Sequence, residues 1–206
     1  MQYLIDQARV FPARAAAHSL HLAGLSRRHR PRAMSISCSD ARVVPALLTA
    51  ARPGDLFELR TYGGVIPPYD EKAPTDASRT VEYAVNELKV SDIIVFGHSL
   101  CDVVTAAARD SQTASNIMPS EADPAPLTEE ATAAGHSHVL SQLDALSNYP
   151  CVVPRLADRS LHLHAWFHEI DTGATFQYSL VPALSSPCSP REQSHPTRRI
   201  RQGERP

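Results

Sequence analysis

The 206-residue sequence predicts an α/β protein with a central, mainly parallel β-sheet flanked by helices. The first observation is the segment DIIVFG at residues 92–97, which is almost continuously apolar, as strands buried on both faces of a parallel sheet are. The second is the alternation, on both sides of that segment, of stretches with helical apolar spacing and short apolar stretches. Frequent prolines and glycines separate these stretches and indicate where each element ends.

The first part of the chain is expected to contain a helical arm, two strands and a long loop. Residues 3–28 have helical apolar spacing with one interruption at a proline. Short apolar stretches at 33–38 and 56–60 predict strands, and residues 45–51 predict a short helix between them. Residues 61–76 contain adjacent glycines and adjacent prolines, which predict a loop.

The second part is expected to continue the alternation. Residues 77–89 place their apolar side chains on one helical face, and a further helix should run from Cys101 to about residue 110. Residues 111–126 are polar and contain proline, so we expect a loop, followed by a helix at about 127–147. Three later strands are predicted at residues 152–157, 161–170 and 175–180.

One domain of ordinary size should span residues 1–182, with residues 1–30 as its N-terminal helical arm. From residue 183 onward, serine, proline and arginine dominate the composition. Such a segment cannot bury enough apolar surface to fold alone, so we expect residues 183–206 to be a disordered tail.

The charge and hydropathy of the chain exclude several classes of partner. The net charge is −2, which provides no basic surface for nucleic acid or for an anionic membrane. No apolar stretch reaches the roughly 18 residues that span a bilayer. The first residues carry an acidic side chain and lack the continuous apolar core of a signal peptide. We therefore expect a cytoplasmic protein that binds neither nucleic acid nor membranes.

Two short segments contain candidate metal ligands. The segment CSDAR, residues 38–42, follows a predicted strand, and GHSLC, residues 97–101, lies where the apolar strand passes into a helix. Zinc prefers a tetrahedron of ligands and accepts thiolate and imidazole, so Cys38, His98 and Cys101 would leave one position for water or substrate. Neighbouring parallel strands end at the same edge of a sheet, which could bring the three together. On spacing alone, the alternative to a metal site is that Cys38 is an ordinary core cysteine and that the His-x-x-Cys sequence binds no metal.

The stretch from Cys38 to Asp102 resembles the β-class carbonic anhydrases, whose motifs C-x-D-x-R and G-H-x-x-C both occur here at the expected separation. The segments PGDLFELRTYGGVIPPY, VEYAVNELKVSDIIVFGHS and WFHEIDTGATFQY also resemble family segments, so the likeness covers most of the first 180 residues. It implies one zinc ion per chain, held by Cys38, His98 and Cys101. It also implies a homodimer or tetramer, with the cleft at the interface and the N-terminal helix reaching over a neighbour.

The resemblance implies a carbonate dehydratase that hydrates carbon dioxide reversibly to bicarbonate by means of zinc-bound hydroxide. Two thiolates donate more charge to zinc than imidazoles do, so the bound water should need help to ionise. Asp40 is the expected helper, accepting a hydrogen bond from that water while Arg42 pairs with it and holds it off the metal. In the family this aspartate can instead bind zinc and close the site. Taken alone, the two residues could also be an inconsequential surface pair.

Several expected pocket residues depart from the family pattern. His29-Arg30-Pro31 aligns with the family's Gln-x-Pro, so His29 takes the place of a glutamine that helps to bind substrate across the dimer interface. Tyr62, Gly63 and Gly64 lie in a segment that reads R-N-A-G-N in the family, and Asp102 replaces the glycine after the second cysteine. Asp102 is either a favourable helix cap or a charge that repels bicarbonate. Tyr62 either fills a pocket sized for carbon dioxide or packs at the interface.

These departures leave two alternatives to carbonic anhydrase activity: a related zinc hydrolase or lyase with another small substrate, and a non-catalytic zinc-binding relative. A second metal site is also conceivable at His162, His164 and His168, although alternating strand histidines are more often packing or surface residues. His136 and His138 lie two apart in a predicted helix, on different faces, and should not share a ligand.

Overall fold

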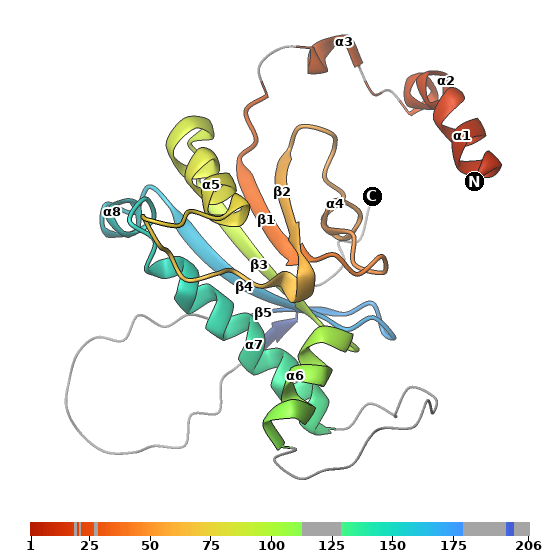
Figure 1. Ribbon diagram of the computed structural model, residues 1–206. Helices are drawn as coiled ribbons and strands as arrows, with labels where there is room; N and C mark the ends of the chain where they lie inside the picture. The colour runs from red at the N-terminus through yellow and green to blue at the C-terminus, as the bar shows by residue number, and fades with distance from the viewer. Residues whose placement is uncertain (19, 21, 27–28, 113–128, 179–196, 200–206) are drawn as a thin grey trace.

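The computed structural model confirms the predicted α/β fold around one six-stranded sheet (Figure 1). The predicted loop at 111–126 from residue 113 onward, and the predicted tail except for three residues, lie outside the described part of the chain. The structure describes residues 1–18, 20, 22–26, 29–112, 129–178 and 197–199.

The strand order is β2-β1-β3-β4-β5-β6. The four strands β2, β1, β3 and β4 are parallel, whereas β5 and β6 are antiparallel to their neighbours. The parallel register brings the carboxyl ends of β1 and β3 to one edge of the sheet. The strands are β1 Ala33–Cys38, β2 Leu56–Thr61, β3 Asp92–His98, β4 His162–His168, β5 Thr175–Tyr178 and β6 Thr197–Arg199.

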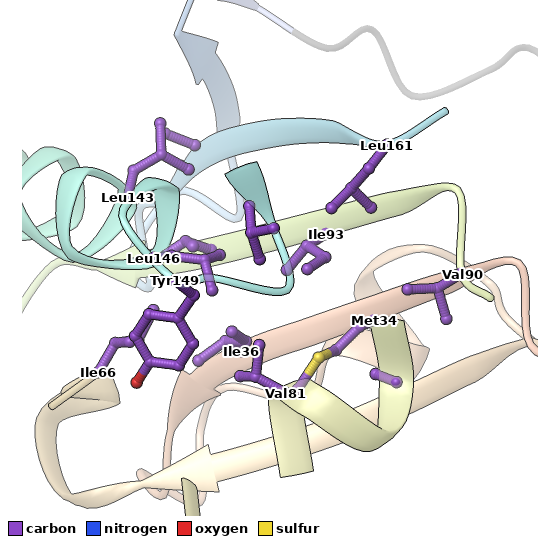
Figure 2. Packing of buried hydrophobic residues seen from close by; sticks show 14 of the residues in the cluster. Met34, Ile36, Ile66, Val81, Val90, Ile93, Leu143, Leu146, Tyr149 and Leu161 are labelled. Atoms are coloured by element: carbon purple, nitrogen blue, oxygen red, sulfur yellow. The ribbon is translucent and has the colours of Figure 1, made fainter. Parts of the chain in front are cut away.

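One face of the sheet is covered by α5 and α7, and α8 lies to one side of it in Figure 1. Their apolar side chains pack with those of the strands into the main core, part of which is drawn in Figure 2. The helices are α1 Gln2–Arg9, α2 Phe11–Ala17, α3 Leu22–Leu25, α4 Pro45–Leu48, η1 Tyr62–Gly64, α5 Asp76–Tyr83, η2 Ala84–Leu88, α6 Asp102–Gln112, α7 Glu129–Ser147 and α8 Val153–Ala157.

Two predicted elements need correction. Residues 152–157 are not a strand, because Val153–Ala157 forms α8 with Pro154 in its first turn, where a missing N–H costs nothing. A short apolar run has no period that distinguishes strand from helix, which explains the wrong prediction. In the predicted tail, Thr197–Arg199 forms β6 and pairs with β5, so these three residues do not fit the expected disorder.

The N-terminal arm consists of α1, α2 and α3 and extends away from the sheet in Figure 1. Pro12 lies in the first turn of α2 and marks the predicted interruption. Of the described arm residues only Ala15 is buried. The arm therefore presents large apolar side chains to its surroundings, namely Met1, Tyr3, Leu4, Ile5, Val10, Phe11, Leu22 and Leu25. None of the described helices is both long and apolar enough to cross a bilayer.

Gly97, one residue before the end of β3, lets α7 approach the sheet closely. A Cβ atom at this position would lie 2.9 Å from Val139 Cβ and 3.1 Å from Phe167 Cδ2, both in the main core. Because these neighbours have little room to move, Gly97→Ala should lower the free energy of unfolding by about 1–3 kcal/mol in urea denaturation. Gly24→Ala is the control, since nothing lies within 4 Å of the added atom. Equal stability of the Gly97 variant and wild type would show that α7 is loosely packed.

Candidate metal centre

Three ligand-bearing side chains meet at the carboxyl edge of the parallel strands. Cys38 ends β1, His98 ends β3 and Cys101 lies immediately before α6. Their ligand atoms all lie within 4.8 Å of one another, and the three residues are buried. Within the described part of the chain, no other group of three or more Cys, His, Asp or Glu residues meets the same distance criterion. The neighbouring parallel strands thus bring together residues that are sixty positions apart, as the sequence predicts.

A strained turn between β3 and α6 lets His98 and Cys101 face the same point. Leu100 adopts a left-handed backbone conformation with φ of 57°, which is uncommon for a residue with a side chain. The turn is held against β4 because the Ser99 N–H donates to the His168 carbonyl at 2.9 Å. The Ser99 hydroxyl in turn accepts a hydrogen bond from the Ile170 N–H at 2.9 Å. These contacts stabilise a conformation that is unfavourable by itself.

The imidazole of His98 has the tautomer that a metal needs. Its Nδ1 lies 2.8 Å from the Ser99 carbonyl oxygen, and since a carbonyl only accepts, Nδ1 carries the proton. Nε2 then presents its lone pair, and it is buried without any hydrogen-bond partner among the described residues. Burial lowers the pKa of His98, which favours the neutral, metal-binding form. A buried ring nitrogen without a hydrogen-bond partner is a costly arrangement unless a cation binds there.

The two sulfurs complete a donor set that fits zinc. Cys101 lies at the N-terminus of α6, where the backbone N–H groups of Val103 and Val104 favour its thiolate. The Asp40 N–H points at the Cys38 sulfur from 3.4 Å. Burial nevertheless raises the pKa of the Cys101 thiol, so a bound cation is what would favour its thiolate. Two thiolates and one imidazole leave a fourth tetrahedral position for a small molecule.

Asp40 and Arg42 form a bidentate ion pair beside this group. Arg42 Nε donates to Asp40 Oδ1 at 3.0 Å and Nη2 donates to Oδ2 at 2.6 Å. The Arg42 N–H adds a third hydrogen bond to Oδ1 at 2.9 Å. The hydrogen bond from the Arg42 side chain is the main reason why the pKa of Asp40 is lowered to about 2. The carboxylate is therefore ionised at neutral pH and directed toward Arg42 in this structure.

Arg60, at the end of β2, is a site residue whose role the sequence did not indicate. Its guanidinium donates to three backbone carbonyls of the loop that carries the first motif: Asp40 and Val43, each at 2.7 Å, and Cys38 at 3.2 Å. These hydrogen bonds fix the backbone of the loop that contains Asp40. A strand arginine carries no pattern that could have predicted these partners, because they depend on how the loop turns its carbonyls.

The structure places four of the five predicted pocket residues beside the metal centre. Gly63 and Gly64 have φ values of 68° and 70°, and a Cβ on Gly64 would lie 3.2 Å from the Cys38 nitrogen. Tyr62 precedes them and is 77% exposed, so it fills no pocket within one chain. Asp102 is the exposed first residue of α6, and its charge helps to raise the pKa of Arg42.

His29, the fifth predicted pocket residue, is not brought to the centre within one chain. It precedes β1, at the opposite edge of the sheet from Cys38. There its ring stacks on Phe57, with centroids 6.2 Å apart. Any role of His29 in a pocket would need a second chain.

The histidines of β4 do not gather into a second metal site. His164 Nε2 lies 2.9 Å and His162 Nδ1 lies 3.8 Å from Asp92 Oδ1, at the start of β3. His168 lies at the far end of β4, where its Nδ1 is 3.1 Å from the Thr175 hydroxyl. The three rings therefore serve separate contacts.

Comparisons with known proteins agree with this geometry. Residues 33–175 match the family model described as carbonic anhydrase. A carbonic anhydrase of Pseudomonas aeruginosa is 36% identical over 187 residues, covering 83% of this chain and 82% of the relative. The solved β-carbonic anhydrase CcaA is 30% identical with a TM-score of 0.72, covering 87% of this chain and 95% of that one. A structure from work on two tetrameric β-carbonic anhydrases of Sordaria macrospora has the same fold, with 22% identity, a TM-score of 0.70 and coverage of 85% and 95%. These matches, together with the three gathered ligand residues, show that the chain belongs to the carbonic anhydrase family, within the β class.

Proposed function

We propose that this chain is a zinc-dependent carbonic anhydrase that interconverts carbon dioxide and bicarbonate, with one zinc ion per chain. The observation that carries the proposal is the buried group of Cys38, His98 and Cys101, whose imidazole Nε2 has no hydrogen-bond partner in the part of the chain that the structure describes. The family membership supports the same chemistry. Zinc, when bound, acts as a Lewis acid that makes water nucleophilic near neutral pH.

The chain's own residues contribute orientation and charge. The two cysteines and His98 act as ligands and exchange no proton during turnover. Asp40, kept ionised by Arg42, offers a carboxylate oxygen that accepts a hydrogen bond from the reacting water and orients it. Arg42 also donates to the Leu100 carbonyl at 2.9 Å, which fixes the pair relative to the second motif. The paired state of Asp40 supports an accessible rather than a carboxylate-closed site.

The charge of Asp102 favours a second candidate function, in which the substrate is not carbon dioxide. This exposed carboxylate begins the helix that follows Cys101 and interacts with Arg42, and a negative charge there disfavours an anion such as bicarbonate. A related zinc hydrolase or lyase acting on a neutral small molecule would tolerate it. Tyr62, which is exposed within one chain, fits a contact with a partner subunit better than a filled pocket.

The test is carbon dioxide hydration by zinc-loaded protein, followed by stopped-flow with a pH indicator at mildly alkaline pH. We expect turnover far above the uncatalysed rate, and its loss on treatment with a chelator that removes the zinc. Zinc-loaded, folded protein with turnover at the uncatalysed rate would reject carbonic anhydrase activity and leave the second substrate or a non-catalytic role. Ester hydrolysis by the same preparation would distinguish between these two.

We also propose that the chain self-associates as a homodimer or tetramer. Exposed apolar side chains lie in or next to η1, at Tyr62 and Val65, and in or next to α4, at Val44 and Leu47, and the arm exposes a larger set. The description of the Sordaria macrospora relatives as tetrameric supports the same assembly. Light scattering should give a mass of at least twice 22.5 kDa. Removal of residues 2–17 should lower the number of chains in each particle. A single species of 22.5 kDa at micromolar concentration would contradict the proposal. A cytoplasmic location stays an expectation from the sequence.

A further inference from the structure

Side chains of α7 and the residues just after it hold the backbone of one segment beside the metal centre. This segment, residues 63–67, is called here the glycine segment. His138 Nε2 lies 2.9 Å from the Gly63 carbonyl oxygen, and the Gln142 side-chain carbonyl accepts a hydrogen bond from the Ile66 N–H at 2.7 Å. Tyr149 donates its hydroxyl proton to the Pro67 carbonyl at 2.6 Å. His138 and Gln142 are one helical turn apart, so both contact the segment from the same face of α7.

The glycine segment touches the protein around both cysteine ligands. At Gly64 a Cβ would lie 3.2 Å from the Cys38 nitrogen, so this residue packs directly on the end of β1. At Gly63 a Cβ would lie 2.6 Å from Val103 Cγ1, so it packs on the first turn of α6. Val103 lies in the first turn of α6, two residues after the ligand Cys101. A change in the position of this segment would therefore reach both sulfur ligands.

His138 contacts the part of the glycine segment whose backbone is least restricted by its own residues. Gly63 and Gly64 both have positive φ, and glycine reaches other backbone conformations at little cost. The Gly63 carbonyl can only accept, so His138 Nε2 carries the proton that holds it. Without that donor, nothing else in the described hydrogen bonds fixes the direction of the Gly63 carbonyl.

We propose that His138 is a positioning residue of the metal centre, acting through the Gly63 carbonyl on the contacts of Cys38 and Cys101. For its effect on turnover the proposal rests on the proposed function. For its effect on metal binding it stands by itself.

The test compares His138→Leu, which fills similar space without a donor, with His138→Gln, which restores an N–H donor of similar reach. Three quantities are measured on folded, loaded protein: the visible spectrum of the cobalt(II) form, the half-life of zinc release to a chelator, and kcat and KM for carbon dioxide. Ser137→Ala, exposed on the same helix, is the control.

We expect His138→Leu to shift the cobalt spectrum, to release zinc about tenfold faster and to lower kcat about tenfold with little change in KM. His138→Gln should recover most of each loss, and Ser137→Ala should match wild type. If the leucine variant kept the wild-type spectrum and release rate, or if glutamine recovered no more than leucine, His138 would only fill space and the proposal would be wrong.

Failure of the proposed function would look different. A wild-type protein that binds zinc but does not hydrate carbon dioxide would reject carbonic anhydrase activity. The cobalt spectrum and the zinc release rate would still decide the role of His138.

Discussion

Cys101→Ala should abolish both zinc binding and turnover. The substitution removes one of two sulfurs from a buried group whose remaining members are Cys38 and His98, and two ligands do not hold zinc in a catalytic site. Metal analysis of the purified variant should fall from about one zinc per chain to a small fraction of that. Carbon dioxide hydration should fall to the uncatalysed rate.

Cys151→Ala is the matched control for this loss. Cys151 is a half-buried cysteine outside the group of three gathered ligands, and burial raises the pKa of its thiol to about 11. This variant should keep its zinc and its turnover. Undiminished zinc in the Cys101 variant would show that the ion binds elsewhere in the chain.

Asp40→Asn should keep the zinc and lose most of the turnover. The carboxylate is not among the three gathered ligands, so the metal content should stay at about one per chain. The amide is neutral and a weaker acceptor, and its NH2 group would face the Arg42 guanidinium or the reacting water. We expect kcat to fall by about 10²- to 10³-fold, as for the loss of a positioned acid–base group.

Asp144→Asn is the control, because it makes the same chemical change at an exposed position of α7. It should leave kcat and zinc content unchanged. Full activity of the Asp40 variant would assign the orientation of water to another group. Loss of its zinc would instead make the Asp40–Arg42 pair part of the metal-binding structure.

The gathering of the three candidate ligands could be predicted because two simple rules reinforce each other. The apolar segment ending at His98 indicates a buried parallel strand, and parallel strands end at a common edge, which brings Cys38 to the same place. Only one unusual backbone feature, the left-handed conformation of Leu100, is then needed to place Cys101 beside His98 and Cys38. The helix at Val153–Ala157 was missed because its apolar run is too short to show a period.

The contacts that support the site could not be predicted in the same way. Arg60 and His138 both bind backbone carbonyls, and a sequence does not state where a loop carbonyl points. The histidines of β4 share a face by alternation, yet six residue steps, at about 3.3 Å each, put His162 and His168 about 20 Å apart. A position such as His29, which is remote within one chain, depends on an assembly that a single chain does not define.

The hydrogen bond from Arg42 to the Leu100 carbonyl joins two loops that lie 58 residues apart in the chain. It does so with protein atoms alone, as does the contact between Ser99 and β4. Because these contacts need no ion, they limit the ordering of the polypeptide that capture of the cation requires. A protein stripped of its metal should accordingly stay folded and recover promptly when the ion is returned.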